Sequence, residues 1–126
     1  MVVALVDDLM FGSKIQSACR VAGVEMTFVR EADAALAALR ARPAAWLILD
    51  LDRDALDPLR VIREVRSSPD LAGVRLAAFV RHTSVDRIKA AREAGAHVVL
   101  ARSAFFPALP QMLAEARGAA APVDRS

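Results

Sequence analysis

The sequence predicts an α/β fold, a doubly wound parallel sheet, and two observations carry this prediction. Short apolar runs alternate with segments of helical periodicity along the chain of 126 residues. The run 45–49 is apolar at every position and ends at Asp50. Continuous apolar runs are typical of strands that helices cover on both faces. The alternation therefore predicts a five-stranded parallel sheet flanked by five helices.

Five segments have the composition of strands. They are residues 2–6, 24–29, 45–49, 76–80 and 97–101. The first and third are apolar throughout, so we expect them in the interior of the sheet. The second alternates apolar Val24, Met26 and Phe28 with polar residues, which predicts a position near a sheet edge.

Five further segments have helical periodicity. They are residues 13–22, 31–41, 58–67, 84–94 and 105–117. The segment 7–12 is expected to be a loop. Thr83, with Asp86 three residues later, predicts an N-terminal cap for the fourth helix. Pro107 and Pro110 predict that the last helix is regular only in its later part.

The totals predict one cytoplasmic domain without a membrane or nucleic-acid partner. The length suits a single domain over residues 1–117, followed by a frayed tail over residues 118–126. A net charge of +2 is too small to predict binding to nucleic acid. No apolar run approaches the ~20 residues of a membrane span, and no targeting segment precedes the first strand. Cys19 lies in a helical pattern and is interpreted as a core thiol rather than a reactive one.

Three carboxylates follow two of the predicted strands. Asp7 and Asp8 follow the first strand, and Asp50 follows the third. The carboxyl ends of these strands should be neighbours across the switch point of the sheet, so we expect the three side chains to converge. Mg²⁺ would offset their mutual repulsion, and an Asp beside it could attack a phosphoryl group. The competing interpretation is that these residues are helix caps or solubilising surface charges.

Other catalytic patterns are absent from the sequence. It contains no G-x-G-x-x-G and no G-x-x-x-x-G-K, which argues against an enzyme that binds or hydrolyses nucleotides. No Ser-His-Asp or Cys-His set can be assembled. His82 and His97 stand apart from other metal-ligating residues, so neither predicts a metal site.

Over residues 1–117 the chain resembles the receiver domain of bacterial response regulators. Leu-Val-Asp7-Asp8 resembles the acidic pair after the first strand of that family, and Leu-Ile-Leu-Asp50 resembles its phospho-acceptor. Glu93-Ala-Gly95-Ala96 resembles its small-residue turn before the fifth strand. The resemblance implies a chemotaxis-type, flavodoxin-like fold with strand order 2-1-3-4-5. It also implies that Mg²⁺ is held by Asp7, Asp8, Asp50 and the backbone carbonyl of Asp52.

The sequence departs from the family at the positions that sense phosphate. Val80 stands where the family has Thr or Ser, and Arg102-Ser103 where it has Lys followed by Pro. Val99 stands where the family has an aromatic residue that changes rotamer. Loss of one donor to a developing charge typically costs ~10²–10³ in rate. We therefore expect slow phosphorylation at Asp50, and no coupling of phosphate to the loop after the fourth strand.

Arg102 keeps the positive charge of the family's lysine but not its compact shape. We expect it to form a bidentate pair with Asp50 or its neighbours, which would hold one state permanently. The alternative is an ordinary exposed arginine.

Three functions follow from these residues. The first is a single-domain receiver-like module of two-component (phosphorelay) signal transduction that acts by protein–protein interaction, with weak or no phosphorylation. The second is a competent Mg²⁺-dependent phospho-acceptor, phosphorylated on Asp50. The third is a small flavodoxin-like metal-dependent enzyme. In the first two, catalysis is limited to self-phosphorylation and dephosphorylation at Asp50.

The resemblance also implies partners. They are a histidine kinase or a downstream effector, and a second copy bound through the face formed by the fourth helix, fifth strand and fifth helix. Basic residues surround the fourth helix, namely Arg81, Arg87, Lys89 and Arg92. A solvated helix face is the competing interpretation of this charge.

Overall fold

The computed structural model describes the backbone of residues 1–81 and 84–120, with side chains through Glu115. Five parallel strands form one sheet in the order β2-β1-β3-β4-β5, which confirms the predicted fold class and strand order. The strands are β1 (Val2–Leu5), β2 (Met26–Val29), β3 (Trp46–Asp50), β4 (Arg75–Val80) and β5 (Val98–Ala101). The helices are α1 (Leu9–Ala22), α2 (Ala32–Ala41), α3 (Pro58–Ser67), α4 (Val85–Ala94) and α5 (Arg102–Ala120).

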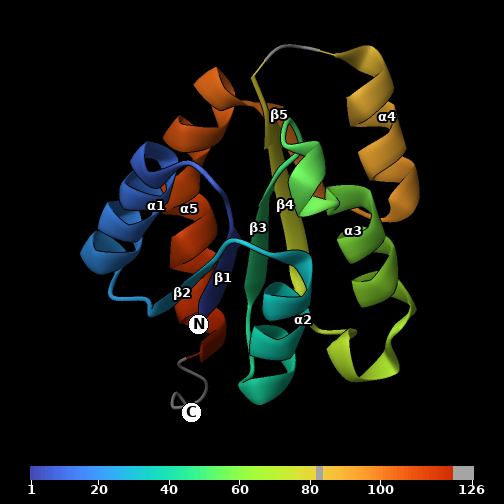
Figure 1. The fold of residues 1–126 in the computed structure, drawn as a ribbon. Helices are drawn as coiled ribbons and strands as arrows, with labels where there is room; N and C mark the ends of the chain where they lie inside the picture. Colours follow the sequence, from blue (N-terminus) through green and yellow to red (C-terminus); the bar gives the residue numbers. More distant parts are fainter. Residues whose placement is uncertain (82–83, 121–126) are drawn as a thin grey trace.

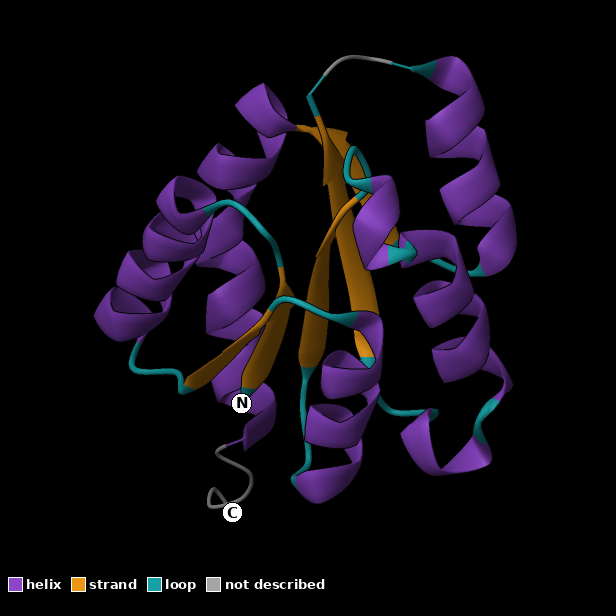
Figure 2. Ribbon diagram, viewed as in Figure 1, coloured by secondary structure: helices purple, strands orange, loops and turns teal. Residues whose placement is uncertain are grey.

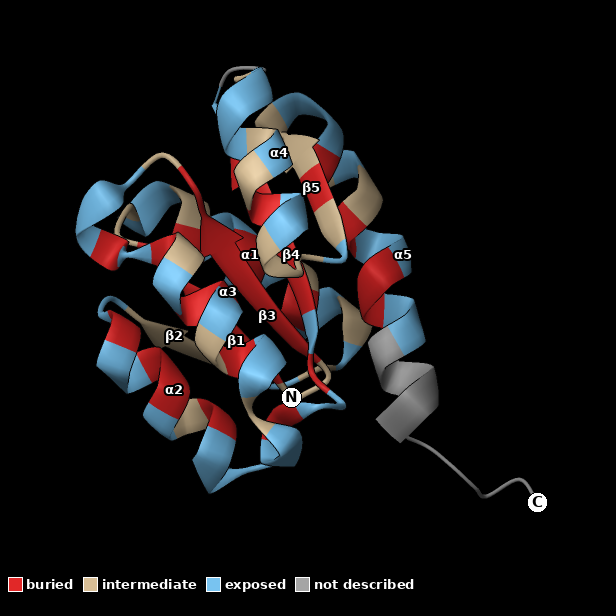
Figure 3. Ribbon diagram, turned by 90° about the vertical axis from the view of Figure 1, so that its right-hand side faces the viewer, coloured by how far each residue is buried: buried red, intermediate tan, exposed pale blue. Residues whose placement is uncertain are grey.

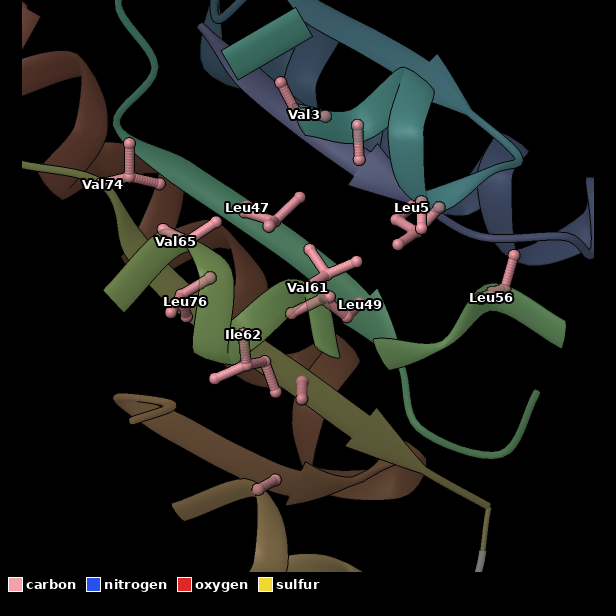
Figure 4. Close-up of a cluster of buried hydrophobic side chains, with 14 of the residues drawn as sticks. Val3, Leu5, Leu47, Leu49, Leu56, Val61, Ile62, Val65, Val74 and Leu76 are labelled. Carbon is pink, nitrogen blue, oxygen red and sulfur yellow. The ribbon is translucent and has the colours of Figure 1, made fainter. Parts of the chain in front are cut away.

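Helices cover both faces of the sheet. Helices α1 and α5 lie on one face, and α2, α3 and α4 lie on the other (Figures 1 and 2). Alternate residues of β1 serve the two layers, because Val3 packs with the α2–α4 side and Val2 with the α1/α5 side. Figure 4 shows the first of these clusters, in which Leu47 and Leu49 of β3 meet Val61 and other residues of α3. The central strands are therefore buried on both sides, as their continuous apolar sequence requires (Figure 3).

The register of the sheet positions the functional edge. Leu5 of β1 pairs with Leu49 of β3, and Asp50 of β3 pairs with Phe79 of β4. Parallel strands in this register end at the same height. The residues that follow β1, β3 and β4 consequently leave the sheet side by side.

Helix α1 begins four residues earlier than the sequence predicted. Its first residue is Leu9, so the loop expected over residues 7–12 is wrong from that point on. The cause is Asp8, whose side chain accepts hydrogen bonds from the backbone N–H groups of Met10 and Phe11. Sequence reasoning favoured metal binding for Asp8 and kept a helix cap as the competing interpretation, and the cap is what the structure shows.

Helix α5 also differs from its prediction. It begins at Arg102, directly after β5, and contains both Pro107 and Pro110. Both prolines are exposed, whereas Phe105 and Leu109 are fully buried under the helix. Packing of this apolar stripe outweighs the loss of backbone hydrogen bonds at the prolines. The helix continues to Ala120, into the predicted tail, and residues 121–126 lie outside the described part.

The N-terminus of α4 is capped by Ser84, whose hydroxyl accepts a hydrogen bond from the N–H of Arg87 at 3.4 Å. The cap predicted at Thr83 and the loop residue His82 lie outside the described residues. Within those residues, none of the helices combines the length and the apolar character needed to cross a bilayer.

His97 links the edge strand β5 to β4 through its side chain. Its Nδ1 accepts a hydrogen bond from the N–H of Leu76 at 2.9 Å, and its Nε2 lies 3.5 Å from Nη1 of Arg66. The pKa of His97 is lowered by partial burial and then by the positive charges of Arg66 and Arg75. Protonation of Nδ1 would destroy its bond to Leu76.

We expect the chain to lose stability below the ordinary histidine pKa of about 6.5. The lowered pKa of His97 in the folded state means that the unfolded chain binds a proton first as the pH falls. The contribution of His97 to the free energy of unfolding is complete above the pKa that the residue has in the unfolded chain. It is lost as the pH falls toward the lower pKa of the folded chain. Urea midpoints at about pH 7.5 and about pH 5.5 measure it. His97→Asn keeps an acceptor but does not titrate, so an equal pH dependence in that variant would contradict the assignment.

We expect Cys19 to resist thiol reagents in the native state. Its side chain is 1% exposed, and burial raises the pKa of the thiol to about 11. The reactive thiolate is therefore about a hundredfold scarcer than at an unperturbed cysteine. Labelling with a disulfide reagent should be slow in buffer and fast in urea. The control is Cys19→Ala combined with Ser17→Cys, an exposed position on the same helix, which should react at once. Equal native rates for both proteins would show that Cys19 is accessible.

Candidate functional site

A charged pocket of about 660 Å³ lies at the carboxyl edge of the sheet. Every strand contributes to it, because each is followed by at least one charged lining residue. The lining residues are Asp7, Asp8, Leu9, Met10, Arg30, Asp50, Asp52, Arg53, Arg81 and Arg102. The predicted acidic residues thus do come together. Four carboxylates meet four guanidinium groups here, so the formal charges cancel.

Asp50 is the centre of this pocket. It ends β3 with no exposed surface, and it is the one charged residue buried within the described part of the chain. Its Oδ1 accepts a hydrogen bond from the N–H of Asp52 at 2.9 Å, and its Oδ2 accepts one from Nη2 of Arg102 at 3.2 Å. Burial raises the pKa of Asp50, against the opposing effects of the Asp52 N–H and the Arg102 charge.

Arg102, the first residue of α5, forms the predicted pair with Asp50. Its side chain is only 14% exposed, so the alternative of an ordinary surface arginine is wrong. The pairing is not bidentate, because the same Nη2 that contacts Asp50 lies 3.8 Å from Oδ2 of Asp52. The guanidinium carbon lies 3.8 Å from the centroid of the Phe11 ring and 5.4 Å from that of Phe79. Stacking on these rings stabilises the positive charge of the Arg102 guanidinium in its largely buried position.

Asp7 and Asp8 are engaged in different ways. Asp7 forms ion pairs with Arg30, at 3.3 Å, and with Arg53. The Arg53 and then the Arg30 hydrogen bond lower the pKa of Asp7. Asp8 caps α1, with 2.8 Å between its Oδ1 and the N of Met10. For Asp8, the competing interpretation of a helix cap describes the contacts that the structure shows.

Asp52 joins the loop after β3 to the end of β4. Its Oδ2 accepts a hydrogen bond from the backbone N–H of Arg81. This contact belongs to the side chain, so the metal-ligand role predicted for its backbone carbonyl stays a prediction.

Val80 does not contribute to the pocket. It is fully buried and packs in the cluster on the α2–α4 side of the sheet. Val99 is 3% exposed and packs in the same cluster. These positions therefore provide apolar packing, and neither offers a hydroxyl to the edge where Asp50 lies.

Several residues of the site were not found by sequence reasoning. Arg30 and Arg53 hold Asp7, and Phe11 and Phe79 support Arg102. Arg30 could have been identified, because it directly follows β2 and the sheet order places β2 beside β1. Phe11 was assigned to a loop, so its position under Arg102 could not be deduced.

Asp7 and Asp50 of the pocket are paired with guanidinium groups, and the divalent metal site expected there stays a prediction. Within residues 1–81 and 84–115, no group of three or more acidic, histidine or cysteine side chains is arranged to hold one. Both oxygens of Asp7 and one of Asp50 face guanidinium groups, and one oxygen of Asp8 caps α1. Guanidinium groups here neutralise the carboxylates that a hard cation would otherwise neutralise.

No family model and no curated protein matches the sequence. Many solved structures share its fold. A response regulator from Hahella chejuensis superposes with a TM-score of 0.78 at 19% identity, over 89% of this chain and 90% of its own. The chemotaxis response regulator CheY4 of Vibrio cholerae gives a TM-score of 0.74 at 18% identity, over 90% and 92%.

A third solved structure carries a metal. The Mn²⁺-bound form of response regulator Rcp1 gives a TM-score of 0.69 at 20% identity, over 90% of this chain and 88% of its own. All three similarities extend over nearly the whole of both chains. The chain therefore has the fold of response-regulator receiver domains.

Proposed function

We propose that this chain is a receiver-like, cytoplasmic module of two-component signalling that acts by binding other proteins and depends weakly or not at all on phosphorylation of Asp50. The fold supports the signalling role, because its solved neighbours are response regulators. The single observation that supports the phosphate-independent part is the buried pair of Asp50 and Arg102.

The pair weakens the nucleophile. A carboxylate oxygen attacks phosphorus with an unshared electron pair, and the hydrogen bond from Nη2 of Arg102 withdraws electron density from Oδ2 of Asp50. Arginine stays protonated in proteins, so the contact cannot be released by loss of a proton. Removing one partner of a buried ion pair costs about 3–5 kcal/mol, so separating the two groups for reaction would slow it by at most about 10²–10⁴.

Val80 adds a second obstacle. A phosphoryl group on Asp50 would carry oxygens that need donors, and a buried valine side chain offers none. One missing donor typically costs ~10²–10³ in rate. Even a slowly formed phosphoryl group would thus lack the hydroxyl through which it could pull on the loop after β4.

The second candidate is a competent Mg²⁺-dependent phospho-acceptor. The observation in its favour is that Asp7, Asp8, Asp50 and Asp52 line one pocket. For this function Arg53 and Arg102 would have to leave Asp7 and Asp50. Nothing in the geometry of the described residues favours the third candidate, a metal-dependent enzyme.

The proposed partners are a histidine kinase or a downstream effector, and a second copy bound through the face of α4, β5 and α5. The basic side chains of α4 offer positive charge to a protein partner, and Lys89 and Arg92 are exposed. Nucleic acid is not among the proposed partners. Arg87 is committed to another contact, because its Nη1 donates to the backbone carbonyl of Leu51.

We expect little phosphoryl transfer to the wild-type chain. Incubation with Mg²⁺ and a small phosphodonor, followed by intact-mass measurement, should leave most of the protein unmodified. The double variant Val80→Thr with Arg102→Lys supplies the hydroxyl and the compact ammonium group, and should raise incorporation at least about tenfold. Asp50→Asn in that background should abolish it. Arg81→Lys, an exposed change at the same edge, is the matched control. Rapid stoichiometric labelling of the wild type, lost in Asp50→Asn, would support the second candidate instead.

We expect Arg102→Met to destabilise the chain by about 3 kcal/mol at neutral pH, because the variant leaves the Asp50 carboxylate buried without its counter-ion. The value is at the lower end of the usual range, since Arg102 is 14% exposed. Adding Asp50→Asn removes the stranded charge and should restore most of the loss. Urea denaturation of the two single variants and the double variant measures the coupling. Additive losses would mean that the pair is not formed in solution.

A further inference from the structure

Helix α4 is held to the rest of the domain with little apolar burial. All ten of its residues are described, and Ala91 alone among them is buried (Figure 3). The neighbouring helix α3, of the same length, buries Pro58, Val61, Ile62 and Val65. Ile88 and Ala94 pack against the core only partly buried, so polar contacts contribute more to the position of α4 than to that of α3.

The main polar contact of α4 comes from Arg87. Its Nη1 donates a hydrogen bond of 2.6 Å to the backbone carbonyl of Leu51, and lies 3.4 Å from Oδ1 of Asp54. Leu51 directly follows Asp50, and its own N–H donates to the carbonyl of Phe79 in β4 at 3.0 Å. A guanidinium-to-carbonyl bond is charge-assisted and is stronger than a neutral one.

The carbonyl that accepts from Arg87 belongs to the same peptide group as the N–H that donates to Asp50. The carbonyl of Leu51 and the N–H of Asp52 are the two ends of one planar unit. One end accepts from Arg87, and the other donates to Oδ1 of Asp50 at 2.9 Å. Each bond polarises the peptide group in the direction that strengthens the other. The unit cannot rotate without changing both bonds.

We propose that Arg87 couples α4 to Asp50 through the Leu51–Asp52 peptide group. A partner that displaces α4 removes Arg87 from the carbonyl and so weakens the N–H bond to Asp50. A change at Asp50 alters the carbonyl and loosens α4 by the same amount, since such linkage is reciprocal. This connection runs between the carboxylate and the partner-facing helix without a hydroxyl at position 80 and without a phosphoryl group.

The surroundings allow this contact to open. A small crevice of about 200 Å³ lies beside it, lined by Leu51, Asp54, Asp57, Pro58, Leu59 and Arg87. The guanidinium can therefore leave the carbonyl and stay near Asp54 or Asp57 without displacing the core. The side chain of Asp52 accepts a hydrogen bond from the backbone N–H of Arg81, the first residue after β4. The Leu51–Asp52 peptide group is therefore also attached to the end of β4.

The test measures the amide of Asp52 in variants of Arg87. Arg87→Met removes the donor and should shift the Asp52 amide resonance and speed its hydrogen exchange about fivefold or more, as expected for a weakened hydrogen bond. Arg87→Lys, which keeps the charge without the planar fork, should have a smaller effect. The matched control is Lys89→Met on the same helix, because the side chain of Lys89 forms no hydrogen bond or ion pair with the described residues. An Arg87→Met protein that matches the Lys89→Met control would overturn the proposal.

A second measurement runs in the opposite direction. Asp50→Asn should shift the amide resonances of α4 in the wild-type background and leave them nearly unchanged in the Arg87→Met background. Equal shifts in both backgrounds would also overturn the coupling. If Arg87→Met does not fold, as judged by circular dichroism, Arg87→Gln, whose shorter neutral side chain does not reach the Leu51 carbonyl in the same way, takes its place in both measurements. Neither readout involves a phosphodonor or a partner, so failure of the proposed signalling role would leave the result unaffected.

Discussion

The burial of one carboxylate constrains the whole carboxyl edge of this sheet. Asp50 has no exposed surface, and a charge in that position is tolerated only with a counter-ion and hydrogen bonds. Arg102 supplies the counter-ion, and the N–H of Asp52 supplies a hydrogen bond. Three features of the structure meet this requirement. They are the start of α5 at Arg102, the stacking of Arg102 on Phe11, and the tight turn after β3. The site is therefore organised around neutralising a charge that the protein already contains.

The layers could be predicted because they depend on short-range patterns, whereas the full strand order was implied by the resemblance to receiver domains. The continuous apolar run of residues 45–49 is typical of a strand buried on both faces, and such a strand belongs in the interior of the sheet. The ends of α1 and α5 could not be predicted in the same way. At Asp8 one side chain suits two roles, and at Pro107 the packing of distant residues outweighs a local preference.

The acidic residues that share the candidate site could be predicted, but the arginine that pairs with each of them could not. Strand ends identify Asp7, Asp8 and Asp50 as neighbours, because parallel strands finish at one edge. Which cation faces each of them depends on side-chain geometry over long sequence separations. Arg53 lies 46 residues from Asp7, and Arg102 lies 52 residues from Asp50. A sequence shows the acids at their strand ends, whereas only a folded chain shows that guanidinium groups occupy the positions around them.

The cancellation of charge within the pocket affects how another molecule finds it. Equal numbers of opposite charges held a few ångströms apart produce a field that fades within a short distance in water. Electrostatic steering, which speeds the encounter of oppositely charged molecules, is therefore weak at this edge of the sheet. Association here should be slow and nearly insensitive to ionic strength, with recognition set by close fit after random collision.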